Sequence, residues 1–184
     1  MVFLDRKVRC HYKDRNAVDI LSGSIVAKME ILNYNKEKEL IIVCIGTDRS
    51  TGDSLGPLTG HFLEKSGLID IPVYGTINNP VHASNLDENI EIINERHKNA
   101  FIIAIDAGLG KQSRIGYIDV KEGSLKPGIG VNKNLSEIGD MHLTGLVNVS
   151  GYMEYLVLQS TRLSIVMSLA EVISKSILKA VGRI

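Results

Sequence analysis

The chain has 184 residues, of which 44% are hydrophobic, and its 21 lysines and arginines are balanced by 21 aspartates and glutamates. This composition is typical of a globular protein with a substantial core, and it excludes the global positive field that draws a protein to nucleic acid or anionic lipid. Residues 40–45 form the longest apolar run, which is too short to span a bilayer. The N-terminus does not resemble a secretory signal and the two cysteines make no disulfide framework, so we expect a cytoplasmic protein.

Hydrophobic periodicity predicts alternating strands and helices along the chain. Apolar residues three or four apart indicate amphipathic helices, and short runs that are apolar on both faces indicate buried parallel strands. Residues 114–123 alternate instead, which predicts an antiparallel strand or one near an edge. The expected elements are helix 16–32, strand 39–45, helix 53–65, strand 71–77, helix 84–97, strand 100–105, strand 114–123, strand 142–149 and helix 161–181. For residues 142–149 the start of a helix is the alternative.

The β-α-β-α-β order over residues 39–106 predicts an α/β fold, a three-layer α/β/α sandwich with a mixed, mostly parallel sheet. We expect one domain over residues 1–184, with residues 1–15 as a loosely attached segment. The apolar stripe of 161–181 predicts core packing, with the seam of a homo-oligomer as the alternative.

A glycine-rich loop, GTDRSTGDSLGP, follows the first predicted strand, as a phosphate-binding loop would. However, Gly46 and Gly52 are separated by five residues rather than four, and Asp53 stands where the lysine is required. A carboxylate at this position would repel a phosphate, so the loop argues against nucleotide binding.

Asp53 and Asp106 each follow an apolar strand, and ligand sites in such sheets form at these strand ends. If strands 39–45 and 100–105 are neighbours, they lie about 4.8 Å apart and the two carboxylates should face each other. Such a pair either shares a proton or holds a divalent metal ion, and both arrangements activate water. In the alternative, Asp53 caps the helix and Asp106 orders its own turn, and Asp48 could replace Asp53 in either role.

A histidine near the two aspartates would complete a metal site, because carboxylate and imidazole ligands suit zinc, nickel and other divalent ions. His142 follows a glycine-rich loop and is the preferred candidate, which makes Asp53, Asp106 and His142 the predicted metal ligands. His82 follows strand 71–77 and is the second candidate.

Four blocks of sequence, IGTDRSTGDSLGP, GTINNPVHASNL, AIDAGLG and KPGIGVNKNLSEIGDMHLTG, resemble the YyaC family of sporulation proteins. The resemblance runs from about residue 20 to the C-terminus. The family is more distantly similar to the spore germination protease and to the hydrogenase maturation proteases. This resemblance implies a phosphorylase/hydrolase-like α/β sandwich.

The resemblance also implies roles for the two aspartates. Asp53 and Asp106 match acidic residues of the germination protease, and the matching pair in the maturation proteases contacts nickel together with a histidine. The implied function is a sporulation-associated peptidase that hydrolyses peptide bonds with a carboxylate pair in the sporulating cell or forespore. Its substrates would be proteins or peptides, such as small acid-soluble spore proteins, rather than nucleic acid or membrane. The alternative is a non-catalytic binding or regulatory protein that keeps the fold.

Overall fold

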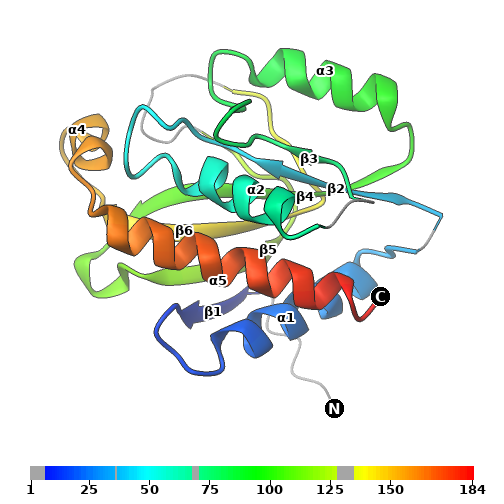
Figure 1. Ribbon diagram of the computed structural model, residues 1–184, viewed down its shortest axis with the longest axis horizontal. Helices are drawn as coiled ribbons and strands as arrows, with labels where there is room; N and C mark the ends of the chain where they lie inside the picture. The colour runs from blue at the N-terminus through cyan, green and yellow to red at the C-terminus, as the bar shows by residue number, and fades with distance from the viewer. Residues whose placement is uncertain (1–6, 36, 68–70, 128–134) are drawn as a thin grey trace.

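A six-stranded mixed sheet in the order β1-β5-β6-β4-β2-β3 forms the centre of the molecule (Figure 1). The structure, a computed structural model, describes residues 7–35, 37–67, 71–127 and 135–184. No helix among these residues combines the length and apolar character needed to cross a bilayer. The elements are β1 (Lys7–His11), α1 (Ala17–Ile31), β2 (Glu39–Cys44), α2 (Leu55–Lys65), β3 (Val73–Tyr74), α3 (Leu86–Arg96), β4 (Ala100–Gly110), the 3₁₀ turn η1 (Gln112–Arg114), β5 (Tyr117–Glu122), β6 (Met141–Val149), α4 (Glu154–Gln159) and α5 (Leu163–Val181).

The strands β3, β2, β4 and β6 run parallel to one another, and β5 lies antiparallel between β6 and β1. β2 pairs with β4 on one side and β3 on the other, which confirms the expected adjacency of the strands that precede the two aspartates. The mixed, mostly parallel α/β sheet predicted from the sequence is therefore confirmed.

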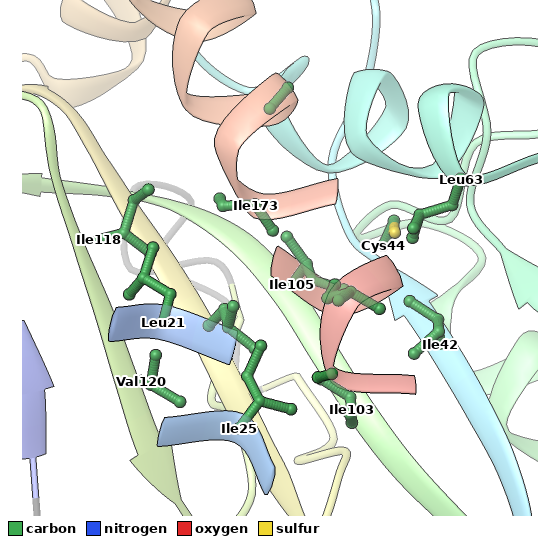
Figure 2. Packing of buried hydrophobic residues seen from close by; sticks show 14 of the residues in the cluster. Leu21, Ile25, Ile42, Cys44, Leu63, Ile103, Ile105, Ile118, Val120 and Ile173 are labelled. Atoms are coloured by element: carbon green, nitrogen blue, oxygen red, sulfur yellow. The ribbon is translucent and has the colours of Figure 1, made fainter. Parts of the chain in front are cut away.

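Three helices, α1, α2 and α5, cover one face of the sheet, which we call the three-helix face. Alternate residues of the strands point into it, including Ile103 and Ile105 of β4, and they pack against Leu21 of α1 and Ile173 of α5. Figure 2 shows these side chains meeting between the sheet and the helices. The apolar stripe of α5 lies in this core, as predicted.

The opposite face, which we call the α3 face, holds a smaller apolar cluster that includes Ile41, Val43 and Ala104. In Figure 1, α5 crosses in front of the sheet, whereas α3 lies apart from the other helices at the top of the view. Since successive side chains of a strand point to opposite faces, Asp106 lies on the α3 face, as its neighbour Ile105 packs under the helices.

Some predicted elements differ from the structure. β1 makes residues 7–11 part of the sheet, so the expected loose attachment is wrong for them, and residues 1–6 lie outside the described residues. The helix α4 was not predicted, and β3 is only two residues long. Residues 128–134, which belong to the last of the four quoted sequence blocks, lie outside the described residues.

Candidate carboxylate site

β4 extends beyond the end of β2, and this length difference positions Asp106. The pairing of the two strands ends at Cys44 and Ile105, and the N–H of Ile45 then donates to the carbonyl of Ile105 at 2.7 Å. Asp106 is the first residue of β4 past this point, and on its other side it pairs with Thr144 of β6. The carboxyl group therefore lies at a step in the C-terminal edge of the parallel strands, where ligand sites form in such sheets.

The loop that leaves β2 folds back on itself and holds Asp53. Gly46 has φ of +140°, and a Cβ there would lie 1.9 Å from the carbonyl oxygen of Asp53, so only glycine fits. The N–H of Thr47 donates to Oδ2 of Asp53 at 3.0 Å. The loop is thus closed by both the backbone and the side chain of Asp53.

Asp53 does not cap α2. The helix begins at Leu55 after Ser54, and Ser54 makes no side-chain capping bond to the helix but donates from Oγ to the carbonyl of Thr51 at 2.7 Å. Pro57 lies in the first turn of this helix, where a missing N–H costs no helical hydrogen bond. The capping alternative is therefore wrong for Asp53, whose carboxylate closes the loop instead. Asp106 does accept a hydrogen bond from the next N–H, that of Ala107, at 2.8 Å, but within a strand rather than a turn.

The two carboxyl groups are electrostatically coupled. Burial, and secondly the charge of Asp53, hold the pKa of Asp106 well above its usual range. Burial also raises the pKa of Asp53, whereas the N–H of Thr47 and the charge of His82 act to lower it. The N–H of Ala107 acts to lower the pKa of Asp106, but that pKa still lies well above its usual range, whereas the pKa of Asp53 is raised less. We therefore assign the shared proton to Asp106 and the charge to Asp53.

His82 is the histidine that contributes to the field at this pair. The bridge between Ile45 and Val81 places it beside the loop, and the N–H of Gly46 donates to the carbonyl of Val81 at 2.8 Å. Nδ1 of His82 accepts from the N–H of Ser84 at 3.2 Å. The neutral ring therefore carries its proton on Nε2.

The structure does not bring His142 to the aspartates. β6 begins at Met141, so His142 lies inside the strand, opposite Ala104, two positions before the residue that pairs with Asp106. Burial lowers the pKa of His142, and its Nδ1 lies 2.8 Å from the carbonyl oxygen of Gly123, to which it donates. The prediction was wrong because β6 runs parallel to β4, so a residue at the start of β6 lies before, and not at, the level of Asp106.

The residues present do not fit the three-ligand metal site predicted with Asp53, Asp106 and His142. Among the residues that the structure describes, no group of three histidine, cysteine, aspartate or glutamate side chains lies close enough to hold a metal ion.

Two further features escaped the sequence reading. Asp119 is buried on the α3 face and forms a bidentate ion pair with Arg9 of β1, including a 2.6 Å bond from Nη2 to Oδ2. The signal was present, because Asp119 alternates with Ile118 and Val120, which point to the three-helix face. The second feature is a cleft of about 390 Å³ beside His82, at the start of α3.

The chain is similar to several known proteins. A protein of Bacillus subtilis (strain 168) named "Uncharacterized protein YyaC" is 53% identical over 140 residues, which are 76% of this chain and 68% of the relative. The crystal structure of the NiFe hydrogenase maturation protease HycI from Thermococcus kodakarensis KOD1 covers 83% of this chain and 99% of its own, with 14% identity and a TM-score of 0.46. Residues 9–176 match a family described as "Protein of unknown function (DUF1256)", and the chain belongs to that family.

Proposed function

We propose that the protein is a peptidase in which Asp53 and Asp106 activate water as an aspartic pair. The observation that carries the proposal is the unequal environment of two coupled carboxyl groups at one sheet edge, with the pKa of Asp106 held well above its usual range by burial and by Asp53. Perturbed and coupled titrations of this kind concentrate at catalytic sites. The resemblance of the surrounding blocks to the YyaC family of sporulation proteins, and the more distant similarity of that family to the germination protease, add a sporulation-associated role and an intracellular location to the proposal.

In this mechanism, the Asp53 carboxylate takes a proton from water while the water oxygen attacks the peptide carbonyl carbon. Asp106 gives its proton to the carbonyl oxygen, which forms a neutral tetrahedral diol. The C–N bond then breaks as Asp53 passes its proton to the amine nitrogen, and Asp106 recovers a proton from one hydroxyl group. The Thr47 N–H orients Asp53 throughout by its bond to Oδ2.

The test is hydrolysis of unstructured peptides, followed by mass spectrometry between about pH 4 and pH 8. We expect Asp53→Asn and Asp106→Asn each to lower the rate by about 10²- to 10⁴-fold, the usual contribution of a general acid or base. Asp48→Asn is the matched control, since Asp48 is an exposed carboxylate of the same loop. No hydrolysis by the parent, or full activity of either Asn variant, would reject the proposal.

A second candidate is a non-catalytic binding protein, which the exposed apolar residues of the α4 segment favour. Tyr152 is 87% exposed, and Met153, Tyr155 and Leu156 are also exposed. Contiguous apolar side chains of this kind mark protein contacts. If this candidate is correct, a partner purified from sporulating cells will stay bound to Asp53→Asn and dissociate from Leu156→Ser.

A further inference from the structure

The cleft at the start of α3 shares one residue, His82, with the surroundings of the carboxylate pair. Its volume is about 390 Å³, and its wall includes His82, the residue whose charge acts on the Asp53 carboxylate. A ligand in this cleft therefore contacts the same imidazole that influences the candidate catalytic base. The other lining residues are Asn78, Asn79, Pro80, Asn85, Glu88, Asn89 and Ile92.

Side-chain amides dominate this lining, and they divide into two groups. Asn85 and Asn89 are bonded within the protein. Oδ1 of Asn85 accepts from the N–H of His82 at 2.8 Å, and its Nδ2 donates to the carbonyl of Pro80 at 3.0 Å. Nδ2 of Asn89 donates to the carbonyl of Asn85 at 2.8 Å. Asn78 and Asn79 are exposed, and within the described part of the chain their side chains make no hydrogen bond. Each free amide offers one acceptor and two donors, which match the C=O and N–H groups of an extended peptide backbone.

The charge of the cleft is negative. Glu88 is the charged side chain in its wall, and among the described residues it has no cationic partner. Along the exposed side of α3, Asp87, Glu91 and Glu95 add three more carboxylates against one cation, Arg96. These carboxylates, two of them in the first helical turn, oppose an anionic ligand such as a phosphate and favour a cationic one.

We propose that this cleft binds an extended polypeptide segment, with Asn78 and Asn79 pairing its backbone and Glu88 pairing a lysine or arginine side chain. The inference rests on the proposed peptidase function, because His82 both lines the cleft and acts on the Asp53 carboxylate. It deepens that function by naming the substrate class as basic, unfolded polypeptide.

The test measures binding of two fluorescent, end-capped peptides to the full chain by anisotropy. The peptides share an alanine and serine backbone, and one carries lysines where the other carries glutamates. Binding is measured in the Asp106→Asn background, so that no peptide is consumed. We expect the lysine peptide to bind about three- to tenfold more tightly, and Glu88→Gln to reduce that preference by about two- to fivefold. Glu95→Gln is the matched control, since Glu95 lies on the same helix outside the cleft, and the preference should stay unchanged.

A second pair of variants probes the backbone contacts. Asn78→Ala and Asn79→Ala should weaken both peptides by the same factor, because backbone pairing does not depend on the side chains of the ligand. Equal affinity for the two peptides, or a preference that Glu88→Gln leaves intact, would overturn the inference. The two proposals fail separately: peptide binding without hydrolysis by the parent rejects only the peptidase, and hydrolysis without a lysine preference rejects only the assignment of this cleft.

Discussion

On the three-helix face, the described strands bury apolar side chains, whereas on the α3 face they place Asp106, Asp119 and His142 among the apolar residues. The first face is stabilised by burial of apolar area and by close packing, which depend little on pH. The second carries buried groups whose charges must be paired or neutralised. The two faces should therefore respond to different perturbations, the three-helix face to changes of side-chain shape and the α3 face to changes of charge and pH.

The largest effect should come from unpairing the buried ion pair of the α3 face. Arg9→Met leaves the buried Asp119 carboxylate without its bidentate partner, which should cost about 3–5 kcal/mol of unfolding free energy. Urea denaturation measures the loss. The double variant Arg9→Met/Asp119→Leu removes both charges and should regain most of the stability, and a double variant as unstable as the single one would contradict this account.

The next effect tests shape on the three-helix face. A Cβ at Gly56 of α2 would lie 2.1 Å from the carbonyl oxygen of Ile45, so Gly56→Ala must displace the helix from the end of β2. We expect a loss of about 1–3 kcal/mol or more, as for other overpacked cores, and the same loss at pH 5 and pH 8. The control is Gly23→Ala in α1, where the nearest atom is Nη1 of Arg183 at 4.0 Å. That variant should gain about 0.5–1 kcal/mol from helix propensity alone.

Asp106→Asn should stabilise the protein in a pH-dependent way. In the parent, the pKa of Asp106 in the folded state is raised above the unfolded value of about 3.9. The contribution of Asp106 to folding stability is therefore fully present below that pH and is lost as the pH rises through the folded pKa. The variant cannot ionise, so its advantage should grow from near zero at about pH 4 to about 0.5–2 kcal/mol at neutral pH. Thermal unfolding at a series of pH values measures the difference, and an advantage that does not change with pH would contradict the assigned protonation.

The smallest effect separates the two histidines. His82 acts to lower the pKa of Asp53, so His82→Gln should raise that pKa and move the acid limb of the activity profile to higher pH. His142→Gln is the control, because His142 lies inside β6 and bonds the carbonyl of Gly123. In this variant the acid limb of the activity profile should stay at the same pH. The pH dependence of kcat/KM distinguishes the two variants. Equal profiles would show that His82 has no influence on Asp53.

The sequence predicted the elements whose periodicity is long and regular, among them α1, β2, β4 and α5, and through them the adjacency of Asp53 and Asp106. It did not place His142 correctly, although it predicted the start of β6 to within one residue, because the register that pairs His142 with Ala104 rather than with Asp106 is set by tertiary structure. It missed β1 because Arg9 and His11 interrupt the apolar run, although Val8 and Cys10 keep the alternation of a strand. Arg9, the residue that pairs with the buried charge of Asp119, lies 110 residues from it in the chain. Only the tertiary structure brings the two together, so sequence patterns could not predict the pair.

In the loop over residues 46–54, the protonation of Asp53 affects the rigidity of the backbone around it. The closing bond of this loop runs from the N–H of Thr47 to the carboxylate of Asp53, and such a bond is stronger when its acceptor is charged. When Asp53 takes up a proton, the hydrogen bond that closes the loop becomes weaker, and when the proton leaves, the bond becomes stronger again. The rigidity of the loop therefore depends on the protonation state of Asp53. A reaction cycle in which Asp53 gains and loses a proton also weakens and restores the hydrogen bond that holds this residue in place.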